Sequence, residues 1–359
     1  MERSERFLRA CRREPVDSTP VWFMRQAGRY MPEYRAIRAN HTLLDIIANP
    51  ELAAEVTLQP VEALGVDAAI IFADILPPLI PMGMKLEYAA GEGPVLHNPL
   101  RDKAAIDALQ PIDPSESLKP TLDAISIVRS ELDGRVALIG FAGGPFTLAS
   151  YAIEGGSSRN YQYTKSLMYS DPDTWALLMD KLATMTADYL LAQVRAGAQC
   201  VQIFDSWAGA LAPEDYRRYV LPATQRIVEA IEPEGVPVIV FGTNTSGMLD
   251  VVAEAGSTVV GVDWRIPIDR AWDIIGQDRA IQGNLDPLVL FAPLPEVKQR
   301  VDDILCRAEG RPGHIFNLGH GILPQTPVET VRAVVDMVHQ HAVNDERSAA
   351  TDQLSASRE

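Results

Sequence analysis

Short, almost continuously apolar runs recur along the chain, and each ends at a polar residue or a glycine. Runs of this kind are typical of parallel strands that are buried on both faces of a sheet. Stretches with a helical pattern follow most of them, so the chain alternates strands with helices. The eight runs are residues 21–23, 68–72, 136–141, 200–204, 237–241, 259–262, 280–282 and 314–318.

Helix-start signals separate these runs. Asn49 before Pro50 predicts the start of a helix, because Asn caps a helix N-terminus and Pro fits the first turn. Residues 171–172, an Asp followed by a Pro, give the same signal ahead of a longer helix. Thr326 and Glu329 have the spacing of a capping box and predict a further helix start near the end of the chain.

Eight strands that alternate with helices predict a single closed (β/α)8 TIM-type barrel, and 359 residues lie within the usual length of that fold. A doubly wound open sheet stays an alternative, because periodicity cannot show whether a sheet closes. Residues 75–100 and 150–165 are too long for simple loops, so we expect extended βα loops that bind a ligand or cover it. We expect the barrel domain to span residues 1–342 and the polar tail, residues 343–359, to be disordered.

The charge balance narrows the choice of partners. The formal net charge is -16, whereas a nucleic-acid-binding protein would need an extended basic surface. No apolar stretch is long and uncharged enough to span a bilayer, and the N-terminus lacks the apolar core of a signal peptide. The three cysteines lie far apart and form neither a disulfide framework nor a close metal pair. We therefore expect a cytoplasmic protein without a nucleic-acid partner, a membrane partner or a bound metal.

Against this acidic background, four arginines fall within fourteen residues, directly after the apolar run 21–23. They are Arg25, Arg29, Arg35 and Arg38. The planar guanidinium can bind a carboxylate or a phosphate through two parallel hydrogen bonds. The cluster therefore predicts a polyanionic ligand that is held at one place.

The four arginines are not equally informative. Arg35 and Arg38 are spaced like one face of a solvated helix, where Glu33 would be an ion-pair partner. Arg25 and Arg29 flank Gly28, whose missing side chain lets a ligand approach the backbone closely. This pair is the stronger candidate for a binding site.

In a (β/α)8 barrel, the active site lies at the carboxyl ends of the strands. Several residues there also have ordinary structural interpretations: Asp74 as a helix cap, Tyr151 and Ser206 as packing or loop residues, and His320 as a buried histidine. Small residues are frequent at these positions, which leaves room for a bulky ligand. The polar residues at or near the predicted strand ends include Arg25, Gln26, Asp74, Tyr151, Asp205, Ser206, Thr243, Asp263, Asn284 and His320.

Residues 24–35 resemble the N-terminal signature of the uroporphyrinogen decarboxylase family. The likeness covers the chain apart from its tail, in order and at ordinary spacing, which makes the set far more specific than any one match. The further matching segments are residues 71–76, 140–148, 151–155, 282–287 and 317–321.

This resemblance implies a cytoplasmic, homodimeric enzyme of haem biosynthesis that needs no cofactor and no metal. Its reaction converts uroporphyrinogen III to coproporphyrinogen III by removing four acetate carboxyls as carbon dioxide. The resemblance implies catalytic roles for Asp74, Arg25 and Arg29, with Asp74 facing the pyrrole N–H groups. The implied substrate contacts are Arg25, Gln26, Ala27, Gly28, Arg29, Asp74, Tyr151, Ser206 and His320, with Arg38 as a further possible one.

One position departs from one version of the family. Asp205, Ser206 and Trp207 stand where some members have Glu-Ser-His, although the serine is kept.

The reaction needs an electron sink, and a protonated pyrrole ring supplies one. A carboxylate near the pyrrole nitrogens would stabilise the resulting cation, so we expect Asp74 to act in its ionised form. We also expect the neighbouring arginines to lower the pKa of Asp74, which disfavours it as the proton donor. The donor itself stays open among Arg25, Arg29, Tyr151, His320 and a bound water.

Two other functions compete with this one. A methyltransferase on the same kind of barrel would activate a thiol with zinc held by His and Cys. Here Cys200 begins a strand, Cys306 lies in the middle of a predicted helix, and no His-x-Cys motif occurs. A tetrapyrrole carrier without activity would use the arginines for binding alone.

Overall fold

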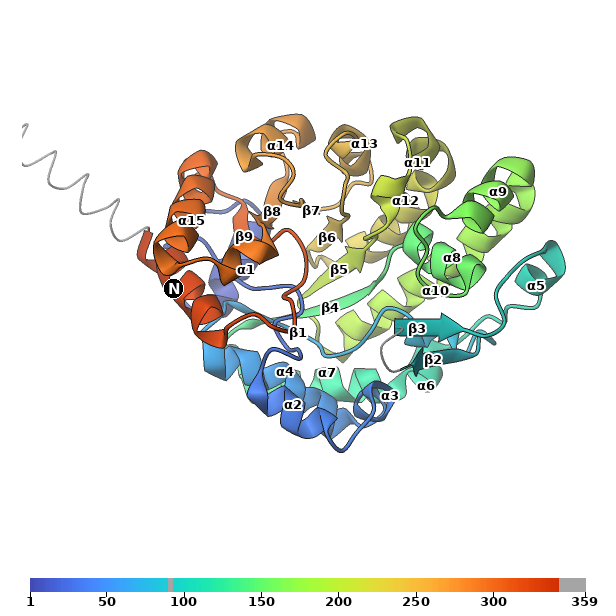
Figure 1. Cartoon of the computed structure of the whole chain (residues 1–359), viewed down its shortest axis with the longest axis horizontal. Helices are drawn as coiled ribbons and strands as arrows, with labels where there is room; N and C mark the ends of the chain where they lie inside the picture. Colours follow the sequence, from blue (N-terminus) through green and yellow to red (C-terminus); the bar gives the residue numbers. More distant parts are fainter. Residues whose placement is uncertain (90–92, 342–359) are drawn as a thin grey trace, which may run out of the picture.

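A seven-stranded parallel sheet forms the centre of the molecule, with helices around its outer side (Figure 1). The computed structural model describes residues 1–89 and 93–341, so the predicted polar tail lies outside the described residues. Neighbouring strands follow the order of the chain without a reversal, which excludes the doubly wound alternative. In spatial order the strands are β1 (Ala68–Ile70), β4 (Ala137–Gly143), β5 (Cys200–Phe204), β6 (Val238–Phe241), β7 (Val259–Gly261), β8 (Ala280–Leu285) and β9 (His314–Leu318).

Seven of the eight predicted strands are thereby confirmed. The strands are buried almost throughout, as near-continuous apolar runs require. A contact across the sheet shows that it is curled. The side chain of Gln282 on β8 donates to that of Gln202 on β5 at 3.1 Å, although these strands are not neighbours. The indole of Trp22 extends this buried chain by donating to Gln282 at 3.0 Å.

The predicted first strand, residues 21–23, does not form as a strand. Val21 makes one isolated bridge to Phe316 of β9, and the carbonyl of Val21 accepts the N–H of Asp67, just before β1, at 2.8 Å. Pairing stops there because the next N–H groups bond to side chains: Phe23 donates to Gln26 and Met24 donates to Asn317. The structure therefore has a curled seven-stranded sheet with this segment between its edge strands, and the prediction of a regular strand at residues 21–23 is wrong.

Asp67 joins the N-terminal helix to the last described helix beside this segment. Its fully buried carboxylate accepts the Val21 N–H at 2.8 Å and the Arg6 guanidinium at 2.7 Å, and it lies 2.7 Å from the Nε2 of His339. The N-terminal helix and the last described helix are thus tied to the start of β1.

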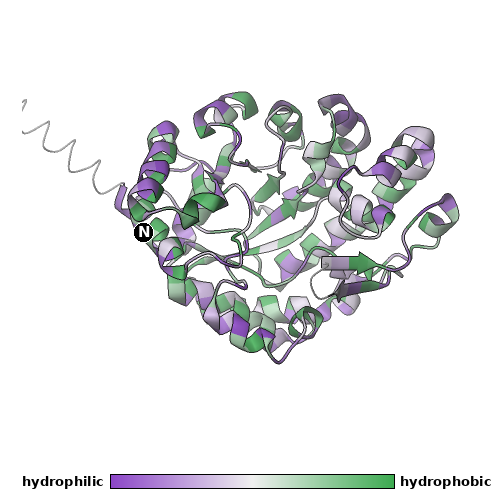
Figure 2. Ribbon diagram, viewed as in Figure 1, coloured by the Kyte–Doolittle hydropathy of each residue, from purple (hydrophilic) through white to green (hydrophobic). Residues whose placement is uncertain are grey.

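Helices surround the sheet, and residues 328–341 are also helical. Apolar colouring dominates the central strands and mixed colouring the surrounding helices (Figure 2). No helix among the described residues is long and apolar enough to cross a membrane. The α-helices are α1 (Arg3–Cys11), α2 (Pro32–Arg38), α3 (Leu43–Ile47), α4 (Pro50–Leu64), α5 (Lys103–Asp107), α6 (Pro114–Ser117), α7 (Lys119–Leu132), α8 (Pro145–Glu154), α9 (Gln162–Ser170), α10 (Pro172–Ala196), α11 (Pro213–Tyr219), α12 (Leu221–Ile231), α13 (Leu249–Ala253), α14 (Ile268–Ile275) and α15 (Leu294–Ala308). The 3-10 helices are η1 (Pro77–Leu79), η2 (Ala208–Ala210), η3 (Glu232–Glu234) and η4 (Pro287–Phe291).

All three predicted helices form, and two of the three predicted N-terminal caps are confirmed. The side chain of Asn49 accepts the Leu52 N–H at the start of α4, and that of Asp171 accepts the Thr174 N–H at the start of α10. The predicted capping box at Thr326 is wrong. The carbonyl of residue 327 accepts the first helical bonds, so Thr326 lies outside the helix, and its hydroxyl finds no partner among the described residues.

An antiparallel hairpin stands apart from the sheet, within the long segment 75–100, and was not predicted. It pairs β2 (Leu86–Ala89) with β3 (Gly93–Leu96). The N–H of Leu96 donates to the carbonyl of Gly155 at 2.8 Å, which fastens the hairpin to the end of α8. Figure 1 shows the hairpin on the same side of the molecule as α8.

Candidate active site

A cavity of about 1010 Å³ opens at the carboxyl ends of the strands. Residues 70–76 at the end of β1 line one side, and the hairpin lines another through Leu86, Tyr88 and Pro94. Phe141, Phe204 and Phe241, near the ends of β4, β5 and β6, contribute three aromatic rings. The cavity is therefore large enough for a bulky ligand that has both apolar and charged parts.

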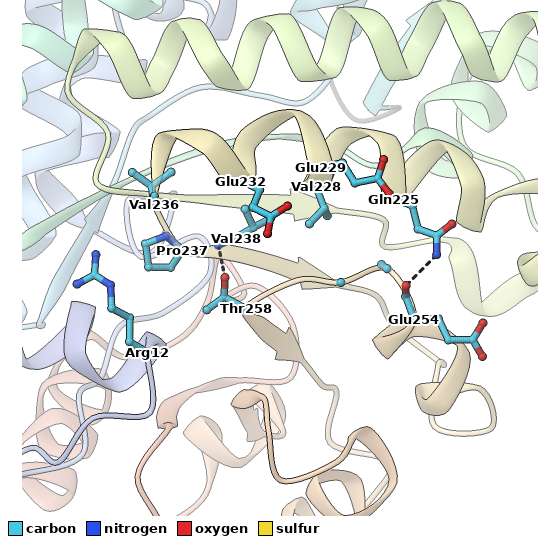
Figure 3. A pocket seen from close by; sticks show the side chains of 13 residues that line it. Arg12, Gln225, Val228, Glu229, Glu232, Val236, Pro237, Val238, Glu254 and Thr258 are labelled. Carbon is cyan, nitrogen blue, oxygen red and sulfur yellow. Dashed lines mark hydrogen bonds between the residues drawn. The ribbon is translucent and has the colours of Figure 1, made fainter.

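A second, smaller pocket of about 410 Å³ lies at the opposite ends of the strands (Figure 3). Its lining includes Arg12 and three glutamates, Glu229, Glu232 and Glu254. Three carboxylates beside one guanidinium do not suit a polyanion, so the larger cavity is the candidate site.

The substrate contacts that the resemblance implies meet at the larger cavity, with one exception. Gln26 is the exception, because its fully buried side chain accepts the Phe23 N–H at 3.1 Å and donates to the Ala68 carbonyl at 3.0 Å. It fixes the arginine-bearing loop to β1 and does not line the cavity. The residues that do line it are Arg25, Ala27, Gly28, Arg29, Asp74, Tyr151, Ser206 and His320.

Arg25 has an unusual backbone conformation, and its side chain passes close to Gly321. Its φ angle is 61°, in the left-handed region that residues other than glycine rarely adopt. A Cβ atom on Gly321 would lie 2.4 Å from the Cδ of Arg25, so only glycine leaves room for this side chain. The guanidinium forms neither a hydrogen bond nor an ion pair with any described residue. Its donors are free for an anionic ligand.

The other three arginines divide between the cavity and its support. Arg29 lines the cavity, and its guanidinium also lacks a hydrogen bond or an ion pair within the described ranges. Arg38 lines the cavity as well and donates to the carbonyl of His41. Arg35 instead donates to the carbonyls of residues 29 and 30, at 3.1 and 2.9 Å, and so stabilises the backbone of the loop that carries Arg25 and Arg29. Glu33 forms no ion pair with Arg35 or Arg38 in the described structure.

Asp74 lies half-buried in the cavity wall. Its Oδ1 accepts the Leu76 N–H at 3.0 Å, which stabilises a turn and does not cap η1. Burial raises the pKa of Asp74, and this effect outweighs the opposing influences of the Leu76 N–H, the Tyr88 hydroxyl and the Arg25 charge. The expectation that arginines would lower the pKa of Asp74 is therefore wrong in its net direction.

His320 is neutral at pH 7. Burial, helped by the positive charges of Arg25 and Arg265, lowers the pKa of His320 to about 4. The ring Nδ1 accepts the Gly321 N–H at 2.6 Å, so the proton of the neutral ring sits on Nε2. His320 thus offers an N–H donor and carries no charge.

Tyr151 and Ser206 are held by an aromatic stack and a buried carboxylate. The ring of Tyr151 stacks on Trp207, with 4.0 Å between the ring centroids and 29° between the planes. Burial is the main cause that raises the pKa of Tyr151 to about 12, so its hydroxyl keeps its proton at pH 7. Beside this stack, Asp205 accepts the Thr147 N–H at 2.8 Å and the Thr147 hydroxyl at 2.7 Å. That hydroxyl in turn accepts the Trp207 N–H at 3.1 Å, which fixes the turn at residues 205–207.

The family model for uroporphyrinogen decarboxylase (URO-D) matches residues 2–341 of this chain. The chain belongs to the uroporphyrinogen decarboxylase family. Among its similar relatives, the uroporphyrinogen decarboxylase of Sorangium cellulosum is 59% identical over 335 residues, which cover 93% of this chain and 96% of the relative. That of a Roseiflexus species is 57% identical over 342 residues, covering 94% and 98%. The resemblance seen in the sequence motifs is confirmed.

The solved structures show that this architecture is shared more widely. A methyltransferase from Methanosarcina mazei superposes with a TM-score of 0.81 over 95% of this chain and 99% of its own, at 21% sequence identity. At that identity the likeness shows a common fold and leaves the reaction open.

Several lining residues of this uroporphyrinogen decarboxylase family member were missed from the sequence. The three phenylalanines lie in apolar runs, where core packing is the ordinary interpretation. Tyr88 was missed because its hairpin was not predicted. The alternation of Leu86, Glu87 and Tyr88 is a strand signal, but it spans too few residues to stand out within a loop.

Proposed function

We propose that this protein is a uroporphyrinogen decarboxylase, a carboxy-lyase of porphyrin and haem biosynthesis. It removes the four acetate carboxyls of uroporphyrinogen III as carbon dioxide to give coproporphyrinogen III, without a metal or another cofactor. The observation that carries this proposal is that two guanidiniums without a protein partner among the described residues and the half-buried carboxylate of Asp74 line one large cavity, in a chain from this family. Relatives at 52–59% identity that are named uroporphyrinogen decarboxylase support it.

Arg25 and Arg29 hold substrate carboxylates in this proposal. The substrate carries eight carboxylates and the protein a net charge of -16, so binding needs local cations that overcome the average repulsion. Each charge-assisted hydrogen bond contributes about 1.5–3 kcal/mol, so a few arginines are enough. Arg38 lines the same cavity and is a further candidate, whereas Gln26 is left out of the proposed contacts.

The backbone N–H groups of residues 27–28, Ser206, Tyr151 and the Nε2–H of His320 complete the proposed contacts at the rim. Because His320 is neutral at pH 7, it donates a hydrogen bond and does not supply a proton as an imidazolium.

Asp74 stabilises the cation that each decarboxylation passes through. A proton adds to a pyrrole carbon, and the ring becomes an iminium-like electron sink. The bond between the acetate methylene and its carboxylate then breaks, carbon dioxide leaves, and the electron pair neutralises the ring. The methylene carbon takes up a proton and the ring carbon releases one, so each carbon dioxide consumes one proton. The ionised carboxylate of Asp74, accepting the pyrrole N–H groups, opposes the positive charge where it develops.

We also propose that residues 20–23 complete a closed (β/α)8 barrel as an irregular eighth strand. Their hydrogen bonds to Phe316 on one side and to Asp67 on the other support this closure. Residues 1–342 are then one catalytic domain, in a homodimer of the cytoplasm. Sedimentation equilibrium tests the dimer, and a monomer at micromolar concentration contradicts it.

An anaerobic incubation with uroporphyrinogen III tests the function. The expected result is a series of products that lose one carboxyl at a time, with one carbon dioxide released per step. Tight binding without carbon dioxide release would identify a carrier. Stoichiometric zinc, together with methyl transfer to a thiol, would identify a methyltransferase of the same fold.

A further inference from the structure

The Asp74 carboxylate faces the cavity and is held at one oxygen by the backbone. Oδ1 accepts the Leu76 N–H at 3.0 Å, and this is the one side-chain hydrogen bond of Asp74 with a defined length among residues 1–89 and 93–341. Carboxylates that are half-buried usually have both oxygens bonded, because their charge is costly to bury otherwise. Oδ2 can therefore accept a further donor from a residue that lines the same cavity.

The hydroxyl of Tyr88 is a buried donor that lacks an acceptor. Tyr88 lies on β2 and lines the cavity together with Asp74. Its hydroxyl oxygen is buried away from solvent and has no hydrogen-bond partner of good geometry within the described part of the chain. A buried hydroxyl without a partner is uncommon and points to a contact that the working site supplies.

The two groups are close enough to influence each other. Burial raises the pKa of Tyr88 well above its usual value, and the adjacent Asp74 charge raises it further. In the other direction, the Tyr88 hydroxyl favours the ionised form of Asp74. The further ionisable groups that act on this pair are Arg25, from the loop after residue 23, and Tyr151, from α8.

We propose that Tyr88 is a positioning residue whose hydroxyl donates to Oδ2 of Asp74 and keeps this carboxylate ionised and facing the centre of the cavity. The inference rests on the proposed function, because it assigns Tyr88 a task only if Asp74 acts as an anion. The proposal also explains the function of the hairpin. The hairpin places the hydroxyl of Tyr88 beside Asp74, which lies fourteen residues earlier in the chain.

The hairpin is built to hold Tyr88 in place. Tyr88 pairs with Pro94 across the antiparallel strands, and the pairing is fastened by the Leu96 N–H on the Gly155 carbonyl at 2.8 Å. Gly155 has a φ angle of 85°, and a Cβ atom there would lie 3.2 Å from the Leu96 carbonyl oxygen, so a glycine suits this contact. The position of the hydroxyl is thus set by β3 and α8 as well as by its own strand.

Tyr88→Phe removes the hydroxyl and keeps the ring, so it tests the proposal directly. A hydrogen bond donated to an ionised carboxylate lowers the pKa of that carboxyl, and its loss must raise the pKa. We expect the acid limb of the pH profile of kcat to move up by about one pH unit. Activity should fall about tenfold on that limb and return near to that of the unmodified enzyme at higher pH, with little change in KM.

Tyr161→Phe is the matched control, because Tyr161 contacts Trp207 and does not line the cavity; its acid limb should not move. A Tyr88→Phe enzyme with an equal loss at every pH, or with an unshifted acid limb, would overturn the proposal. Equal thermal unfolding temperatures would show that the variant is folded.

Asp74→Asn separates this inference from the proposed function. In that background, adding Tyr88→Phe should change neither residual turnover nor the affinity for uroporphyrinogen, since the carboxylate on which Tyr88 acts is gone. If Asp74→Asn alone keeps full activity, the role of Asp74 in the proposed function fails. If Asp74→Asn loses activity while Tyr88→Phe behaves as the unmodified enzyme does at all pH values, only the role of Tyr88 fails.

Discussion

Replacing Gly321 with alanine should weaken substrate binding through Arg25, although residue 321 itself offers no charge. The new Cβ atom would lie 2.4 Å from Cδ, 2.7 Å from Cγ and 3.0 Å from Nε of Arg25. Carbon atoms in contact stay about 3.5–4.0 Å apart, so the arginine must move by about 1 Å or more. Its guanidinium has no partner in the described structure that would resist this movement.

The magnitude follows from the bonds that the displaced guanidinium would lose. One charge-assisted hydrogen bond is worth about 1.5–3 kcal/mol, which corresponds to about 10- to 100-fold in affinity. We therefore expect the KM of Gly321→Ala for uroporphyrinogen to rise by about 10- to 100-fold in an anaerobic assay, with a smaller change in kcat.

The control is Gly247→Ala, because a Cβ atom on Gly247 meets nothing within 4 Å. Its KM should equal that of the unmodified enzyme. Arg25→Ala should reproduce the defect, and the double variant should be no worse than Arg25→Ala alone, because the two changes act through one contact. If Gly321→Ala binds substrate normally while Arg25→Ala does not, the steric reasoning is refuted.

Two further predictions concern stability. Burial raises the pKa of Asp205 to about 6, above its unfolded value near 3.8, so the folded protein should lose about 3 kcal/mol from this group as the pH rises from 4 to 8. Asp205→Asn should remove this dependence in urea unfolding, and a stability difference between the two proteins that stays constant with pH would contradict it. Asp67→Ala leaves Arg6 without its fully buried partner and should lower the free energy of unfolding by about 3–5 kcal/mol at pH 7. A loss below about 1 kcal/mol in urea would contradict this role, and Asp17→Ala, at the exposed side of the same arginine, is the milder control.

The strands could be predicted because each is buried on both faces of the sheet. Such a strand is a run of consecutive apolar residues, and this run is visible in the local sequence without knowledge of distant segments. The segment 20–23 shows the limit of this reasoning. Its composition is that of a strand, but its pairing is cut short by the side chains of Gln26 and Asn317, which lie 3 and 293 residues from their respective partners. The hairpin at residues 86–96 was missed because four-residue strands carry too little pattern within a loop that is rich in proline and glycine.

The site was predictable in its membership and less so in its electrostatics. Family motifs named Arg25, Arg29 and Asp74, and all three line one cavity. Gln26 is adjacent to Arg25, but it points into the protein, and sequence adjacency cannot show which way a turn directs each side chain. The pKa of Asp74 depends mainly on its burial, which distant segments determine. The nearby arginines, which are visible in the sequence, therefore predicted a lowered pKa where the net shift is upward.

The central claim is that an anionic Asp74 opposes the positive charge of the reacting pyrrole. Asp74→Asn keeps the shape of the side chain and removes the charge, and its kcat and its dissociation constant for uroporphyrinogen III can be measured separately under anaerobic conditions. We predict that kcat falls by about 100-fold or more while the dissociation constant changes by less than about tenfold. Equal losses in turnover and in affinity would contradict the account.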